Sequence, residues 1–176
     1  MKTNLQFFAK DRTNMVSLLD IGSLTGSTEK LVEMGDGFTE LTEDWGPNTD
    51  SKQYVNMSTS SNTVKGYAFS MTPSRDYMSD DMQSAIDTLF KTFPTGDKCN
   101  TYYYRFYKTD IKNNTGDCIR VPVTVCPSST GGSGGDTLTS SIQINGNGES
   151  KQGTITIGSD GSFTWKEKVD AASSKA

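Results

Sequence analysis

Histidine is absent from all 176 residues of this chain. That absence excludes Ser-His-Asp hydrolases, Cys-His proteases, histidine-ligated zinc sites and histidine general bases. Catalysis would have to rely on carboxylates, lysine, tyrosine or cysteine, and no pair of these stands out by its spacing. We therefore expect no enzymatic activity, no catalytic residues and no cofactor.

Cysteine is scarce as well, with only Cys99, Cys118 and Cys126 in the chain. An odd number of cysteines favours reduced thiols rather than a disulfide framework. A structural metal site would need closely spaced cysteines or nearby histidines, and the chain has neither. We expect ordinary thiols and no bound metal.

Long apolar runs and an excess of basic charge are also missing. A membrane-spanning helix needs about 20 consecutive apolar residues, so we expect no membrane anchor. The formal net charge is −4. Because nucleic-acid phosphates attract basic surfaces and repel acidic ones, the composition argues against nucleic-acid binding.

One segment has clear helical periodicity. Its apolar residues recur at intervals of three and four, which places them on one face of a helix. We predict a helix over residues 79–92, capped by Ser79 and ended by Pro94 and Gly96. The predicted apolar face consists of Met78, Met82, Ile86, Leu89, Phe90 and Phe93.

Short alternating or apolar segments predict eight to ten strands in the rest of the chain. Two of them, at 30–34 and 37–42, are expected to form a hairpin around an Asp-Gly step. Pro122 has no N–H donor, so the strand over 118–126 is expected at a sheet edge or with a bulge. The predicted fold is mainly β with one α-helix, a sandwich or barrel of two sheets flanked by that helix.

The same pattern predicts the domain organisation. Residues 1–12 are expected to be a flexible N-terminal arm, and residues 13–150 the β-sandwich domain with its helix. Residues 151–166 form a predicted C-terminal hairpin, either further strands of the core or a small appendage. Residues 167–176 are expected to be a mobile tail. A Gly- and Ser-rich stretch at 127–136 is typical of a flexible connection.

A long polar segment, residues 43–62, interrupts the strand pattern. It is rich in turn-forming residues, and yet it contains Trp45, Tyr54 and Met57. A long loop with large apolar residues is often either functional or folded back onto the core. The residues alone leave both interpretations open.

Acidic residues are concentrated just before and within this segment. Between residues 29 and 50 there are seven acidic side chains and one basic one. Such a run is most often a solvated face. It would also suit a surface that must not adhere to DNA, since like charges repel.

The order of these features resembles the major tail protein, or tail-tube protein, of long-tailed bacteriophages of the siphophage type. The resemblance rests on AFSMTPSRDYMSDDMQSAIDTLFKTFPTGDKCNTYYYRFY, residues 68–107, preceded by the acidic strands and the long loop. It extends over about residues 15–145 as an order of elements. Proteins of this family form hexameric rings that stack into a hollow tube through which DNA is ejected.

The resemblance implies a self-assembling structural protein of the virion tail, built in the cytoplasm of the host. Its implied partners are copies of itself, a tail-tip or baseplate initiator, the tape-measure protein and the tail terminator, with DNA passing through unbound. The residues it implies at contacts between rings or subunits are Trp45, Pro47, Tyr54, Met57, Asp80, Asp81 and Asp87. Those it implies in the lumen are Glu33, Asp36, Glu40 and Glu43.

The alternative function is an all-β binding module, immunoglobulin-like or carbohydrate-binding, on a virion or cell surface. It predicts a monomer with an exposed aromatic patch and detectable glycan or peptide binding, whereas a tail-tube subunit polymerises. An enzyme that uses carboxylates alone, such as a glycosidase, would need a carboxylate pair in a cleft, which the sequence does not indicate.

Overall fold

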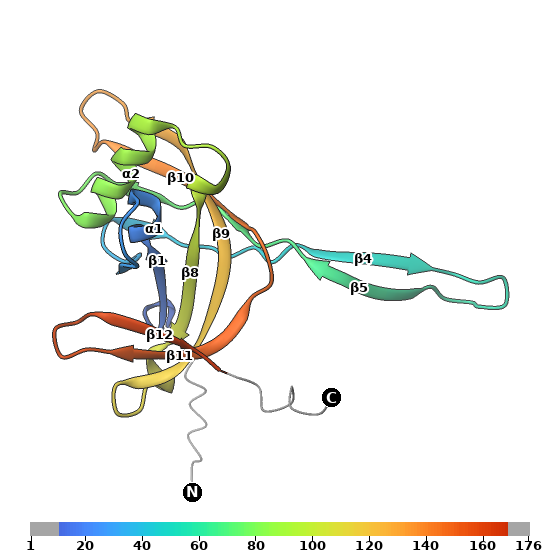
Figure 1. Ribbon diagram of the computed structural model, residues 1–176. Coiled ribbons are helices and arrows are strands. Elements are labelled where there is room, and N and C mark those ends of the chain that lie inside the picture. The colour runs from blue at the N-terminus through green and yellow to red at the C-terminus, as the bar shows by residue number, and fades with distance from the viewer. Residues whose placement is uncertain (1–10, 169–176) are drawn as a thin grey trace, which may run out of the picture.

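The computed structural model describes residues 11–168 and is mainly β (Figure 1). Its strands are β1 (Met15–Asp20), β2 (Leu31–Glu33), β3 (Phe38–Glu40), β4 (Pro47–Lys52), β5 (Ser61–Tyr67), β6 (Ser70–Met71), β7 (Ser74–Asp76), β8 (Asn100–Tyr107), β9 (Thr115–Gly131), β10 (Thr139–Gly146), β11 (Lys151–Ile157) and β12 (Phe163–Glu167). Its α-helices are α1 (Ile21–Thr25) and α2 (Asp81–Thr92). The expected fold class, mainly β with one principal helix, is confirmed.

Ten strands form one curled sheet in the order β2-β1-β8-β9-β10-β7-β3, with β6, β11 and β12 joined to it. The strand pairs are antiparallel. β9 pairs with β8 along one side, while its other side pairs first with β11 and then with β10. β4 and β5 pair only with each other and project from the body as a separate ribbon (Figure 1).

Both faces of the central strand β8 are buried, because successive side chains of a strand point to opposite faces. Tyr103 belongs to a core that it shares with α2 and with Ile144 of β10. Tyr104 belongs to a second core, which the β11–β12 hairpin completes with Ile155. The side chains of these two tyrosines and two isoleucines are fully buried, and burial of each contributes roughly 1.5–3 kcal/mol to stability. The hairpin at 151–166 therefore lies within the sheet and closes its second face.

The helix α2 covers one face of the sheet, as predicted, but its ends differ from the prediction. Its N-cap is Asp80 rather than Ser79, and the Asp80 carboxylate accepts a 2.8 Å hydrogen bond from the Gln83 amide. Met78 and Phe93 lie beyond the two ends and are exposed, so their assignment to the buried face is wrong. The buried helix residues are Met82, Gln83, Ala85, Ile86 and Leu89.

The predicted hairpin between residues 30 and 42 is wrong. β2 pairs with β1 and β3 pairs with β7, so the two strands do not meet. The turn does occur, with Gly37 at φ 79°, but Arg75 of β7 donates a 3.0 Å hydrogen bond to the Asp36 carbonyl. The turn is thereby hydrogen-bonded to β7 and does not close a hairpin between β2 and β3.

Pro122 lies in a central strand and not at a sheet edge, and the irregularity in the pairing of β9 falls between Pro127 and Ser129 rather than at Pro122. Neither form of the prediction, an edge or a bulge, therefore holds at Pro122. It faces the gap where the partner of β9 changes from β11 to β10, and its carbonyl accepts a 2.8 Å bond from the Asn147 amide. The nitrogen and carbonyl of one strand residue face the same side, so the missing N–H falls in this gap. No ladder bond to β8 is lost, and the strand continues through the expected flexible connection as far as Gly131.

The predicted terminal arm and tail fall mostly outside the described residues. Residues 1–10 and 169–176 are not described, whereas Arg12 begins a 3-10 turn and Glu167 is the last residue of β12. A further difference from the prediction is the one-turn helix α1, whose N-cap Asp20 accepts bonds from the Gly22 and Ser23 amides.

Candidate assembly surfaces

The segment expected to be a loop is an ordered ribbon, which we call the arm and define as residues 47–67. β4 and β5 pair over their lengths, with one ion pair of 2.9 Å between Lys65 Nζ and Asp50 Oδ2. Nearly all arm side chains are exposed. Polar residues occupy both faces, so no apolar alternation marks the strands in the sequence. An isolated two-stranded ribbon is marginally stable in water.

The tip of the arm presents apolar side chains to solvent. Tyr54 is 63% exposed, Met57 is 40% exposed, and Val55 between them is fully exposed. The turn is held by a 2.9 Å bond from the Met57 amide to the Tyr54 carbonyl and a 3.1 Å bond from Gln53 Nε2 to the Met57 carbonyl. The tip is therefore a shaped apolar surface that no other described part of the chain covers.

Glu43 fixes the root of the arm to the sheet. Its side chain is only 6% exposed, and its Oε1 accepts a 2.6 Å bond from the Tyr103 hydroxyl. Its Oε2 accepts from Arg105 Nη1 at 2.9 Å and from Trp45 Nε1 at 3.1 Å. A buried carboxylate needs such partners, because an unpaired buried charge is strongly destabilising. Burial and the adjacent carboxylate raise the pKa of Tyr103 far above its usual range, so the hydroxyl stays a neutral donor.

Aromatic rings continue the connection from the arm root into the core. The Trp45 ring lies 4.8 Å from the Phe69 ring, which lies 5.4 Å from the Tyr103 ring. The Arg105 guanidinium lies 5.7 Å from the Trp45 ring centre. Trp45 thus packs back onto the core, as one of the two interpretations of this segment predicted. The tip residues Tyr54 and Met57 instead remain exposed. Pro47 is exposed where the arm begins.

A groove opens beside the arm root, between the arm and the connection from β10 to β11. Its volume is about 520 Å³. Gly146 closes one side, because its amide donates a 2.7 Å bond to the Phe69 carbonyl and a Cβ there would lie 3.1 Å from the Phe69 Cβ. The groove is lined by Trp45, Gly66, Tyr67, Ala68, Phe69, Val121, Gly146, Gly148, Glu149 and Ser150. Sequence reasoning missed this feature; the glycines of INGNG were its only signal.

Asp80, expected at a subunit contact, is engaged within its own chain. Its two oxygens accept bonds of 3.0 and 2.6 Å from Arg75, and it also caps α2. The hydrogen bond from Arg75 holds the pKa of Asp80 below its usual value, against the opposing effect of burial. The Arg75 side chain is 1% exposed, so Asp80 supplies the charge that this buried guanidinium requires.

Asp81 and Asp87 lie on the accessible side of α2. Asp81 forms a 2.8 Å ion pair with Lys30, and its side chain is 66% exposed. Asp87 accepts a 2.7 Å bond from the Tyr77 hydroxyl and a 3.0 Å bond from Gln83 Nε2, and the Tyr77 bond lowers the pKa of Asp87. Both carboxylates can be reached by another molecule without disturbing the core.

The four acidic residues expected in a lumen are not all exposed. Glu33, Asp36 and Glu40 are exposed. Glu33 and Glu40 line a shallow depression together with basic side chains of the N-terminal turn and the β8–β9 connection. Glu43 lies apart from them in the arm root, where Arg105 neutralises it.

Two negative observations apply to the described residues. No group of three or more cysteine or acidic side chains between residues 11 and 168 is placed to hold a metal ion. Over the same range, no helix is both long and apolar enough to cross a membrane.

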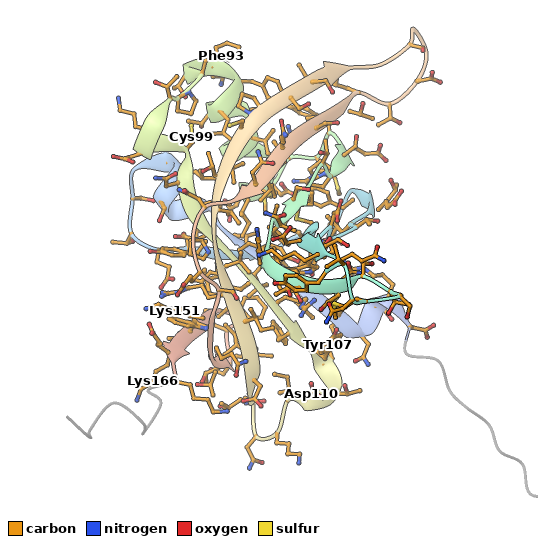
Figure 2. All side chains as sticks on the ribbon, turned by 90° about the vertical axis from the view of Figure 1, so that its right-hand side faces the viewer. Phe93, Cys99, Tyr107, Asp110, Lys151 and Lys166 are labelled. Carbon is orange, nitrogen blue, oxygen red and sulfur yellow. The ribbon has the colours of Figure 1, made fainter. Side chains whose placement is uncertain are left out.

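Seen along the arm, the body extends above and below the arm root (Figure 2). Phe93 and Cys99 lie toward one end of the body, and Tyr107 and Asp110 lie toward the other (Figure 2). The arm thus leaves the middle of the body, between these two ends.

Comparison with solved structures identifies this architecture. No family model matches the chain, and no curated protein matches it in sequence. A chain in the tail of an empty GTA particle, determined by helical refinement with C6 symmetry, superposes with a TM-score of 0.57 at 13% identity. The match covers 81% of this chain and 97% of that one. A chain in the virion of a native gene transfer agent particle gives 0.56 at 10% identity, over 82% and 98%. This chain therefore shares the fold of chains in that tail and that virion, as the resemblance led us to expect.

Proposed function

We propose that this chain is a structural subunit of a virion tail, which assembles with copies of itself into stacked hexameric rings around a channel for DNA. The arm carries the proposal: an ordered ribbon leaves the body and ends in apolar side chains that its own chain does not cover. Contact between the arm of one copy and the body of the next is heterologous, and such contacts produce rings or filaments. The C6 symmetry of one tail of the same fold supports a sixfold ring.

Within such a tube, the arm and the helix α2 have different roles. Pro47, Tyr54 and Met57 on the arm contact the neighbouring copy, while Trp45 fixes the arm root. On α2, Asp81 and Asp87 provide a second contact surface, and Asp80 has the structural role of a cap. Tyr54 and Met57 fit this role because aromatic and methionine side chains are enriched at protein interfaces.

The exposed acidic residues Glu33, Asp36 and Glu40 line the channel in this proposal. Their charge repels the phosphates of DNA, so that DNA passes without specific binding. A tail-tip or baseplate initiator, the tape-measure protein and the tail terminator are the further partners of such a tube. Assembly takes place in the host cytoplasm and the product is part of the virion tail.

Shortening the arm tests the proposal. Thr49 and Val64 are paired across the ribbon, so residues 50–63 between them can be replaced by Asn-Gly, a favoured two-residue turn. The shortened variant should keep its far-UV circular dichroism spectrum and thermal midpoint but form no tubes by electron microscopy. The unaltered protein should form tubes at high concentration, with or without a tail-tip initiator.

A tip variant with the complete arm provides the matched comparison. Tyr54→Ser combined with Val55→Ser removes apolar groups and should reduce tube formation, whereas Asn56→Ser at the same turn should not. An unaltered protein that stays monomeric under all conditions would count against the proposal. If that monomer bound glycans, it would instead fit the all-β binding module.

A further inference from the structure

The arm tip and the groove at the arm root have complementary apolar and charged side chains. The tip has exposed apolar side chains at Tyr54, Val55 and Met57, and the groove has aromatic walls. Lys52 lies at the end of β4 next to the tip, and Glu149 lies on the groove. Both are exposed, and the ion pairs among residues 11–168 include neither of them.

The tip cannot reach the groove of its own chain. Eight residue steps separate Pro47 from Val55, which at 3.4 Å per residue is roughly 27 Å along the ribbon. The root is held by Glu43 through three hydrogen bonds and by the contact of the Trp45 ring with Phe69, so the arm does not fold back. The groove that receives a tip must therefore belong to a second copy.

We propose that the arm tip of one copy inserts into the arm-root groove of the next copy, where Lys52 pairs with Glu149. The inference rests on the proposed self-assembly and adds the receiving site. Burial of the tip side chains against Trp45 and Tyr67 supplies the driving force, because removing apolar surface from water dominates most protein associations. The charge pair selects the orientation.

The shape of the groove suits a ribbon as its occupant. Gly66 leaves part of its wall without a side chain, with open space where a Cβ would stand, so a backbone can approach closely. The volume of about 520 Å³ has room for more than one side chain. The phenol of Tyr54 would lie among aromatic rings, for which offset and edge-to-face contacts are favourable.

A charge exchange tests the pairing. Lys52→Glu and Glu149→Lys should each raise the protein concentration needed for tube formation about tenfold, measured by sedimentation of polymer. The double variant should return to within about threefold of the unaltered protein, because the pair is restored with opposite polarity. Lys112→Glu, which reverses an exposed lysine on the β8–β9 connection, should have no effect. Thermal midpoints verify that each variant is folded.

A cross-link tests the geometry independently. In a Cys126→Ser background, Val55→Cys with Ser150→Cys places one thiol on the tip and one on the groove. A short bismaleimide should then produce a ladder of covalent oligomers, whereas either single cysteine variant should give none beyond dimers.

The outcomes separate the inference from the function on which it rests. Tubes that form normally with each single charge reversal, or cross-links confined to single chains, would overturn the tip-to-groove contact and leave the tail-tube function intact. An unaltered protein that forms no tubes would overturn both.

Discussion

The hydroxyl of Tyr103 donates a 2.6 Å hydrogen bond to Glu43 Oε1, and this bond joins the central strand β8 to the root of the arm. The Tyr103 side chain is completely buried, and its ring is stacked on Phe69. The position of the arm root is thus set by the core of the protein.

Tyr103→Phe should weaken the arm root while retaining the ring. The change removes one donor to a nearly buried carboxylate, which should lower the free energy of unfolding by about 1–2 kcal/mol in urea denaturation. Hydrogen exchange should also become faster in the arm than in α2. Tyr102→Phe on the same strand is the control and should change stability by less than about 0.5 kcal/mol. Equal losses from the two variants would contradict the assignment of Glu43 as the anchor.

Asp80→Asn should destabilise the fold through Arg75. Asn remains a good helix cap, so this change isolates the loss of the carboxylate that pairs with a buried guanidinium. We expect a loss of about 2 kcal/mol at pH 7, less than for a fully buried pair because Asp80 is partly exposed. Asp80→Ala should cost about 1 kcal/mol more, since the cap is also lost. Asp81→Asn, which breaks an exposed pair, should cost less than about 1 kcal/mol.

The same pair predicts a dependence on pH. The folded state lowers the pKa of Asp80, so its stabilising effect is present above the ordinary aspartate pKa of about 3.9. It is lost as the pH falls through the lowered, folded-state pKa. The stability difference between the unaltered protein and Asp80→Asn should therefore shrink below about pH 4, as urea titrations at several pH values can measure. A difference that stayed constant down to pH 2 would exclude the ion pair as its source.

Gly153→Ala should destabilise the β11–β12 hairpin. A Cβ at this position would meet the Lys166 carbonyl oxygen and lie 2.7 Å from the Trp165 ring. Backbone and a packed ring cannot yield easily, so we expect a cost of about 1–3 kcal/mol by chemical denaturation. Gly134→Ala, where a Cβ would have open space, is the control and should be nearly neutral. A neutral Gly153→Ala would mean that the hairpin is free to shift.

The three thiols should differ in reactivity. Burial raises the pKa of Cys118 to about 12 and also raises the pKa of Cys99, whereas Cys126 is only half-buried. Because the thiolate is the reactive form, maleimide at pH 7 should label Cys126 first. Mass spectrometry should find one fast site in the folded protein, absent in Cys126→Ser, and three sites in urea. Fast labelling of Cys118 would contradict its burial.

The sequence pattern correctly predicted the helix α2, because helix formation depends mainly on residues that are close in sequence. The spacing of Met82, Ile86 and Leu89 identified the helix and its buried face, because helical periodicity depends on near neighbours alone. The same spacing could not show that Met78 and Phe93 lie past the ends. The choice of Asp80 as cap depends on Arg75, a residue of another element, so the sequence pattern near Ser79 could not reveal it.

Strand partners and the arm were not predictable in the same way. An Asp-Gly step indicates a turn, but whether β2 then pairs with β3 or with β1 depends on residues far along the chain. The arm has polar residues on both faces and therefore lacks the alternation by which half-buried strands are recognised. Glu43 was expected in a lumen, and only its spatial neighbours Tyr103 and Arg105 show that it is an anchor.

The pairing of β1 with β8 has a consequence for the order in which the chain is synthesised and folds. Met15 is paired with Tyr107, so the first strand must wait for 92 further residues to be translated before it finds its partner. The arm is a local hairpin that can form earlier, since short loops close fastest. Its anchor Tyr103 belongs to the late strand, however, so a half-made chain has a ribbon without a fixed direction. The direction of the ribbon is therefore fixed only after synthesis has passed the middle of the protein.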